Sequence, residues 1–192
     1  METGNTSLVC RPVWQDVLNS TIAHNTVSVD QQLQANADGT LDEWTVKGGL
    51  TTLAATAAKT YAGVTLKRTV KLSAGRIEDR FECVSETEHT YDWAFHAPGT
   101  LTTSLKLEPR TAPLGKDKGY RHVTGVVRGK TGAAWWARWD AGGASLTLRF
   151  EAAPDTEVIT GAGPGRDPRD KVPVVIVRRR AAKTVFAATH EM

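Results

Sequence analysis

Residues 64–72 read VTLKRTVKL, and apolar and polar side chains alternate along them. In an extended strand the valines and leucines fall on one face, and the lysines and threonines fall on the other. Arg68 is the single polar residue that interrupts the apolar face. A period of two is typical of a β-strand that buries one side. The segment therefore predicts a half-buried strand with a charged group in its apolar series.

The same period recurs on both sides of this segment. Residues 144–150 read ASLTLRF and alternate, as do residues 101–107, whereas residues 172–177 read VPVVIV and predict a more buried strand. Residues 53–59, LAATAAK, are alanine-rich, which favours a helix, but the run is short and flanked by threonines, so we interpret it as a strand. Short strands joined by turn residues predict an all-β fold, a two-layer antiparallel β-sandwich.

Length and composition indicate one domain over residues 1–192. The 192 residues, 40% hydrophobic and 23% charged, suffice for one core and are too few for two ample ones. Proline and glycine predict loops near residues 109–119 and 161–171. A net charge of +3 with both signs interspersed gives no reason to expect nucleic acid. No apolar run reaches the roughly 18–20 residues that span a bilayer, so we expect no membrane partner.

The N-terminal residues and the two cysteines do not indicate the cellular compartment of the protein. METGNTSLVCRP lacks a basic segment followed by an apolar one, so no signal peptide is visible and localisation stays open. Cys10 and Cys83 could form one disulfide, and whether they pair is left open. Two cysteines do exclude a disulfide scaffold and a four-cysteine zinc site.

Three groups of residues are candidates for chemistry. His24 and Asn25 precede an alternating run, where a polar pair can project from a sheet, or where the histidine ring can simply satisfy a backbone carbonyl. Tyr120 and His122 are catalytic candidates, although a strand would point the intervening Arg121 to the opposite face.

The third group comprises tryptophans that could bind carbohydrate: Trp135, Trp136 and Trp139. In a strand the first and last share one face, and the middle one faces the other side. Core packing is the competing interpretation for most of these indoles, and we expect at least one to be exposed. The run Arg178–Arg180 could meet an acidic polysaccharide, but we interpret it as a solvated strand end.

Residues 20–30, STIAHNTVSVD, resemble a signature of the C-terminal β-sandwich of heparinase II/III-like polysaccharide lyases, which include oligoalginate lyases. Further resemblances follow in order along the chain, and the last is similar to a closing hairpin of that family. These are residues 61–70, 76–81, 91–96 and 172–186. Together they span nearly the whole sequence. The resemblance implies a module of a lyase that acts by β-elimination on a uronate-containing polysaccharide such as alginate or a heparin-like glycan.

The resemblance also implies what this sequence lacks. Enzymes of the family carry an α/α-toroid before the sandwich, and the toroid supplies the residue that neutralises the uronate carboxylate and the tyrosine that acts on the sugar. This sequence starts after that part, so whether it is itself an enzyme stays open, and we expect it to lack full catalytic machinery alone. Its expected partners are an acidic polysaccharide, the missing toroid, or a second copy in a homo-oligomer.

A metal is a further implication of the resemblance. Relatives hold zinc with two histidines and an aspartate, and His24 matches one ligand position. Glu2 stands in the acidic position, and His96 is the remaining candidate. The cofactor would be zinc or another divalent metal, which normally needs three or four protein ligands. Two alternatives therefore stand beside the lyase module: a self-sufficient metal-dependent carbohydrate-active enzyme and a carbohydrate-binding module.

Overall fold

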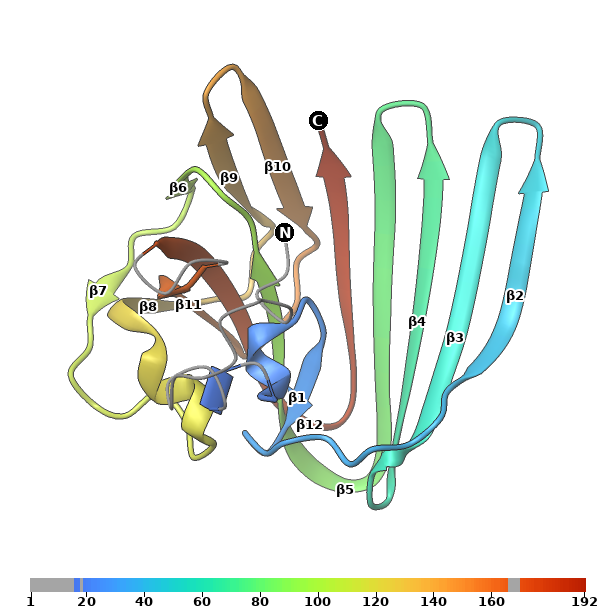
Figure 1. The fold of residues 1–192 in the computed structure, drawn as a ribbon, viewed down its shortest axis with the longest axis horizontal. Helices are drawn as coiled ribbons and strands as arrows, with labels where there is room; N and C mark the ends of the chain where they lie inside the picture. The colour runs from blue at the N-terminus through green and yellow to red at the C-terminus, as the bar shows by residue number, and fades with distance from the viewer. Residues whose placement is uncertain (1–15, 18, 166–169) are drawn as a thin grey trace.

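A computed structural model describes residues 16–17, 19–165 and 170–192, so Glu2 and Cys10 lie outside the described residues. The described chain forms one antiparallel sheet of twelve strands and two short 3-10 helices (Figure 1). The strands are β1 Val27–Val29, β2 Thr40–Lys47, β3 Leu50–Tyr61, β4 Val64–Ser73, β5 Arg76–His96, β6 Thr100–Thr103, β7 Glu108–Pro109, β8 Thr124–Thr131, β9 Trp135–Ala141, β10 Ala144–Phe150, β11 Thr156–Pro164 and β12 Lys171–Glu191. The 3-10 helices are η1 Thr21–Ala23 and η2 Lys118–His122. No helix in the described part is long and apolar enough to cross a membrane.

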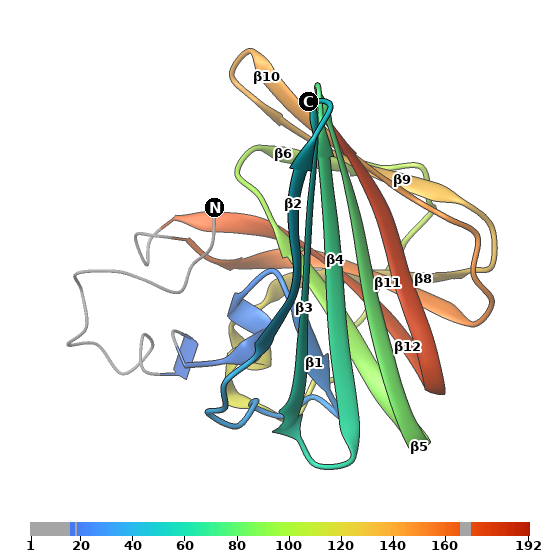
Figure 2. The same ribbon diagram turned by 90° about the vertical axis from the view of Figure 1, so that its right-hand side faces the viewer.

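Two long strands turn this single sheet into two layers. β5 and β12 pair from Arg76 opposite Glu191 to His96 opposite Val174, with a register shift next to Ala181. One half of the pair lies in a first layer with β2, β3, β4, β10, β9 and β6, and the other half continues into a second layer with β1, β11, β8 and β7 (Figures 1 and 2). The predicted all-β sandwich is confirmed, and its layers are joined through continuous backbone pairing.

The main core fills the space between the two layers. Alternation along each strand brings the same face of every first-layer strand inward, as the sequence period predicts. Phe81, Leu148 and Phe186 come from the first layer, and Trp93 and Val177 come from the second; all are buried. A smaller core covers the outer face of the second layer. It is built from Ile22, Ala94, Leu114, Tyr120, Ile159, Val174 and Ile176.

Strands β2, β3 and β4 form a wing that extends beyond the second layer (Figure 1). The register places Trp44 opposite Leu53 and Leu53 opposite Val70, so these side chains share the inner face. Trp44 is nevertheless 66% exposed and Val46 is 70% exposed. The inner face of the wing is therefore apolar and open to solvent.

Several local predictions differ from the structure. Residues 161–164 belong to β11, so the predicted loop at 161–171 begins too early. The C-terminal segment is one strand of 21 residues and not a closing hairpin. β6 ends at Thr103, so the alternation over residues 101–107 outlasts the strand. The alanine-rich residues 53–59 do lie in a strand, because β3 runs between β2 and β4 and small side chains suffice there.

The contrast between core and wing gives a stability prediction. Phe186→Ala should lower the free energy of unfolding by about 3–5 kcal/mol, because its ring is 2% exposed between the layers. Leu72→Ala, on the wing at 46% exposure, should cost less than about 1 kcal/mol. Urea denaturation of both variants measures the difference. Similar losses would mean that the wing is covered in solution.

Candidate functional site

Asn25 fixes the position of His96 at the edge of the second layer. β1 pairs with β5 so that Val27 lies opposite Trp93, and extending this register places the end of η1 beside the end of β5. The backbone N–H of His96 donates to Asn25 Oδ1 at 2.8 Å, and Asn25 Nδ2 donates to the His96 carbonyl at 3.4 Å. His96 Nδ1 lies 3.3 Å from the same Oδ1 atom. The amide thus holds both the backbone and the ring of His96.

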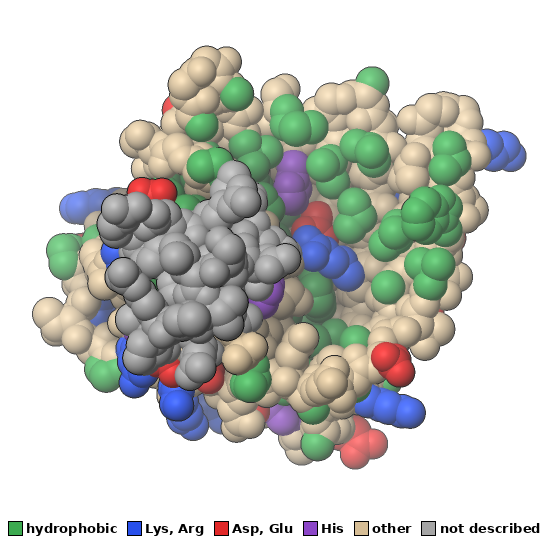
Figure 3. All heavy atoms as spheres, viewed as in Figure 1, with side chains coloured by type: hydrophobic (Ala, Val, Ile, Leu, Met, Phe, Trp, Pro, Cys, Tyr) green, Lys and Arg blue, Asp and Glu red, His purple; other side chains and the backbone are tan. Residues whose placement is uncertain are grey.

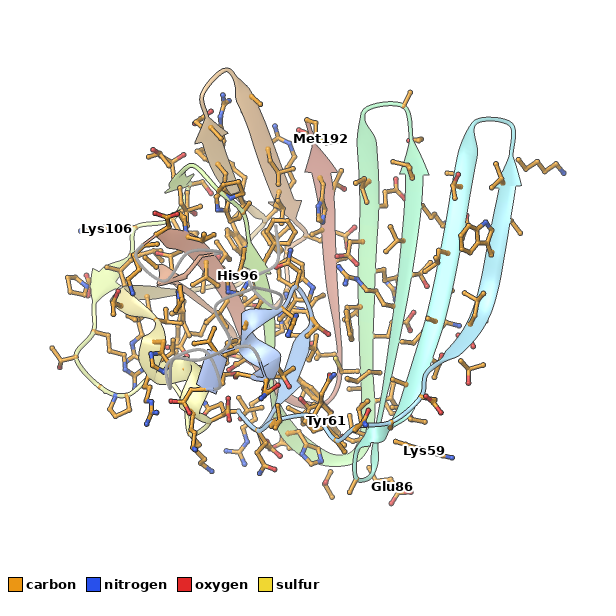
Figure 4. The ribbon with its side chains drawn as sticks, in the orientation of Figure 1. Lys59, Tyr61, Glu86, His96, Lys106 and Met192 are labelled. Atoms are coloured by element: carbon orange, nitrogen blue, oxygen red, sulfur yellow. The ribbon has the colours of Figure 1, made fainter. Side chains whose placement is uncertain are left out.

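The His96 ring is an uncharged base in the interior (Figure 4). Its side chain is 3% exposed, and burial, together with the neighbouring His24 ring, lowers the pKa of His96 to about 3. The two candidate histidines therefore lie within electrostatic reach of each other. His24 is half-buried and lines a surface pocket with Thr21 and Gln34.

An ion pair between the half-buried Arg68 and the buried Asp79 joins this region to the first layer. Arg68 donates from Nε and Nη2 to the two carboxylate oxygens of Asp79, at 2.9 and 2.7 Å, and from Nη1 to the Asn25 carbonyl at 2.8 Å. His190 Nε2 lies 3.7 Å from Asp79 Oδ2. Burial alone would raise the pKa of the Asp79 carboxyl, but His190 and Arg68 hold that pKa below its usual value. Figure 3 shows basic, acidic and histidine side chains close together in the middle of one face of the molecule.

The described residues provide only part of a metal site. Two imidazoles lie near each other, and the uncharged form of His96 is the form that binds zinc. Among residues 16–17, 19–165 and 170–192, however, no group of three His, Cys, Asp or Glu side chains could hold a metal ion. The proposed acidic ligand, Glu2, lies outside the described residues. The described residues therefore supply two of the three or four ligands that zinc normally needs, and a metal at His24 and His96 stays a prediction.

Tyr120 is a buried structural residue in this fold. Residues 118–122 form η2, so the strand that was expected to place Tyr120 and His122 on one face is absent. The Tyr120 hydroxyl donates to Asp92 Oδ2 at 2.6 Å, and burial together with Asp92 raises the pKa of Tyr120 well above its usual value. His122 instead approaches Asp16, with 3.5 Å between Nε2 and Oδ2. The structure does not bring the two candidates together.

The other two tyrosine hydroxyls also have structural partners. Tyr61 donates to the Gln32 carbonyl at 3.2 Å, and the Tyr91 hydroxyl lies 3.0 Å from Ser85 Oγ inside the core. Burial raises the pKa of both Tyr61 and Tyr91. Each of the three tyrosine hydroxyls is thus engaged in the packing of the sandwich.

The tryptophans of β9 separate into two environments. Trp135 and Trp139 are 4% and 1% exposed, and the Trp135 ring stacks on Phe150 with 4.1 Å between ring centroids. Their indoles are core residues, so neither offers a face to a sugar. Trp136 points to the other side and is half-buried. It remains the candidate for carbohydrate binding.

The expectation of a solvated strand end at Arg178–Arg180 is wrong for the first two residues. Arg178 donates from Nε and Nη2 to the buried Asp92, at 2.6 and 2.7 Å. Arg179 is 8% exposed, and its Nε donates to Thr156 Oγ1 at 2.8 Å. Arg180 lies at the surface near Glu88. The pattern misled because β12 passes through the middle of the sheet at this point.

The family model described as heparinase II/III-like, C-terminal, matches residues 2–182. The chain belongs to this heparinase II/III-like C-terminal family. No curated protein sequence matches it significantly.

Solved structures of family enzymes share the fold. Heparan sulfate lyase HepC from Pedobacter heparinus superposes with a TM-score of 0.64 at 14% identity, covering 90% of this chain and 24% of that one. A structure of heparinase III gives a TM-score of 0.62 at 13% identity, with 90% and 24% covered. This heparinase II/III-like chain therefore spans about a quarter of the length of the solved structures it matches. At these identities the likeness concerns the fold alone.

Sequence reasoning missed part of this heparinase II/III-like domain's polar interior. Asp92 and His190 were not candidates, although both have low exposure and charged neighbours. The single arginine in the alternating run at residues 64–72 was a usable signal, because a charge on an apolar face requires a buried partner. Nothing local to the sequence around residue 190 indicates that it faces Asp79.

The burial of His96 predicts a pH dependence of stability. Its pKa of about 3 lies below the usual 6.5, so the unfolded chain binds more protons between these values and stability is lost as pH falls through this range. From pH 7 to pH 5 the loss from this group should be about 2 kcal/mol.

Urea denaturation at the two pH values measures this effect. His96→Gln should remove that part of the dependence, whereas His89→Gln, at a half-exposed position beside Asp30, should largely keep it. An unchanged pH dependence in His96→Gln would contradict the assignment.

Proposed function

We propose that this chain is the sandwich module of a polysaccharide lyase that acts by β-elimination on a uronate-containing polysaccharide, such as alginate or a heparin-like glycan. In this proposal the module forms one wall of the substrate cleft and supports a catalytic toroid, carried by the same polypeptide or by another one. Membership of the heparinase II/III-like C-terminal family is the observation that carries the proposal. The likeness to heparan sulfate lyase and heparinase III supports it.

The chemistry of β-elimination explains why a second domain is needed. The uronate carboxylate must be neutralised, a base must remove the proton at C5, and an acid must protonate the leaving oxygen. The three tyrosine hydroxyls of this chain are engaged in packing contacts. Arg68 and Arg178 are committed to the buried carboxylates Asp79 and Asp92. The proton-transfer groups are thus expected to come from the toroid.

Two alternatives each have one supporting observation. The proximity of His24 and His96 is compatible with a metal-dependent carbohydrate-active enzyme if further ligands complete the site. The half-buried Trp136 on the outside of β9 is compatible with a carbohydrate-binding module. In the lyase proposal, His24 and His96 belong to the wall of the substrate cleft, and the ligand bound in that cleft is an acidic polysaccharide.

The first prediction from this proposal concerns activity. The chain alone should produce no more than a trace of unsaturated product from alginate, heparin, heparan sulfate or hyaluronan, because its tyrosine hydroxyls, Arg68 and Arg178 are already engaged in contacts within the sandwich. Ultraviolet absorbance of the product measures this, with a toroid-bearing lyase of the family as positive control. Robust turnover that is abolished by His24→Ala would instead establish a self-sufficient enzyme.

The second prediction concerns zinc. Two histidines with no third ligand among the described residues should bind zinc weakly, because water must complete the coordination shell. Elemental analysis of protein purified without added metal should find well under one zinc per chain, and a chelator should barely change the melting temperature. One tightly held metal per chain, lost in His24→Ala and kept in His89→Ala, would contradict this.

A further inference from the structure

Strand β2 is an exposed edge of the first layer (Figure 1). Within the described residues it pairs with β3 on one side only, and every residue of β2 is exposed. Edge strands of natural proteins are usually blunted by proline, by a bulge or by charged side chains. β2 has a bulge between Leu41 and Glu43, but residues 43–47 beyond it are regular, carry no proline, and bear charges of opposite sign at Glu43 and Lys47, which can attract a second strand. This part of the edge can accept another strand.

The turn after β2 defines which backbone groups are free. Gly48 and Gly49 have φ angles of +58° and +80°, as a two-residue hairpin turn of type I′ requires at both central positions, and Lys47 pairs with Leu50 across it. The carbonyl of the first turn residue bonds the N–H of the fourth, so the backbone groups of Lys47 face β3. Because this direction alternates along a strand, the N–H and C=O groups of Trp44 and Val46 face outward.

We propose that two copies of this chain associate by antiparallel pairing of β2 with β2 of the second copy, with Thr45 opposite Thr45 on the two-fold axis. In this register Trp44 lies opposite Val46 of the second copy, and both have outward-facing backbone groups. Each such pair exchanges two hydrogen bonds, and the two-fold axis repeats the pair. The first layers of the two copies then form one continuous sheet.

The side chains are self-complementary in this register. Glu43 lies opposite Lys47 of the second copy on the outer face, which gives two opposite-charge pairs by symmetry. On the inner face, the 66%-exposed Trp44 and the 70%-exposed Val46 meet their counterparts and cover one another. The Glu43 side chain is already held on the outer face, because Thr45 Oγ1 donates to its Oε1 at 3.0 Å. Apolar side chains are visible along this wing at the right of Figure 3.

Neighbouring registers fit less well. Hydrogen bonds form between the two copies only where residues whose backbone N–H and C=O groups point away from β3 lie opposite each other. The second strand can therefore shift only by steps that keep Trp44 and Val46 opposite residues of this kind. One shift places Val46 opposite Asp42, which lies in the bulge, and leaves Glu43 opposite Thr45. The opposite shift moves Trp44 against Gly48 in the turn. The register centred on Thr45 is the one that pairs charges and apolar side chains together, and this complementarity identifies a second copy as the occupant.

Charge reversal tests the register directly. Glu43→Lys and Lys47→Glu each place like charges opposite each other twice, so each should weaken dimerisation about tenfold in sedimentation velocity. Mixing these two variants should restore association as a heterodimer, because both cross-copy pairs then become Lys–Glu. The double variant Glu43→Lys/Lys47→Glu should also dimerise. Lys59→Glu, exposed on β3 beyond its pairing with β2, is the matched control and should leave dimerisation unchanged.

A cysteine on the axis provides an independent test. A non-hydrogen-bonded antiparallel pair brings Cα atoms to about 4.5 Å, within the range of a disulfide. In a Cys10→Ser background, with Cys83 buried, Thr45→Cys should therefore form a covalent dimer on mild oxidation. Thr40→Cys, at the other end of β2, should not. Far-ultraviolet circular dichroism of all variants should match that of the parent, because these positions are exposed in the single chain and their substitution leaves its fold intact.

Three results would overturn the proposal. The first is a monomer at about 0.1 mM, a concentration at which even weak interfaces are populated. The second is a dimer that neither charge reversal nor the mixture affects, which would place the interface elsewhere. The third is a dimer that Thr45→Cys fails to cross-link while Thr40→Cys succeeds, which would indicate another register.

Discussion

The backbone pairing of β5 with β12 is the constraint on which the rest of the structure depends. The two strands stay hydrogen-bonded along their length while they pass from one layer into the other. Where the two strands bend from one layer into the other, buried polar groups need a hydrogen-bond donor. Arg179 is that donor: it bonds Thr156 Oγ1 and the Val185 carbonyl, and its guanidinium lies 4.8 Å from the centre of the Phe186 ring. Burial lowers the pKa of Arg179, because the charged guanidinium is removed from water.

The other buried charged side chains likewise have hydrogen-bonding partners that offset the loss of water. Asp92 accepts from the Tyr120 hydroxyl and from Nε and Nη2 of Arg178, and Nη2 of Arg178 also donates to the Leu114 carbonyl. The network therefore fastens the segment around η2 onto the outer face of the second layer. Breaking one partner of such a pair leaves a buried charge unpaired, which is far more costly than losing an exposed pair. On the inner face of the first layer, the Asp79 carboxylate pairs with Arg68 in the same way.

The sequence predicts which strands bury one face, but it does not predict which distant segments pair with one another. Alternation predicted the half-buried strand at residues 64–72 and the strand at residues 144–150, because one buried face imposes a period of two regardless of the partner strand. It could not reveal that residues 171–191 form a single strand, since that depends on pairing with β5 nearly a hundred residues earlier. For the candidate site, the structure brings His24 close to His96, and this proximity follows from the register of β1 with β5; their role as metal ligands stays a prediction. Tyr120 and the arginines at 178–179 were misjudged because their partners are distant in sequence.

The position of β12 in the sheet has a consequence for biosynthesis. This strand contains residues 171–191, yet it lies between β5, β10 and β11 and holds the two layers together. Until that segment has emerged from the ribosome, the hairpins β2–β3–β4 and β9–β10 have no common neighbour, and their apolar faces stay uncovered. Such late, non-local pairing makes folding slow and leaves the nascent chain open to aggregation. Synthesis of this domain should accordingly depend on chaperones that hold the chain until its last strand arrives.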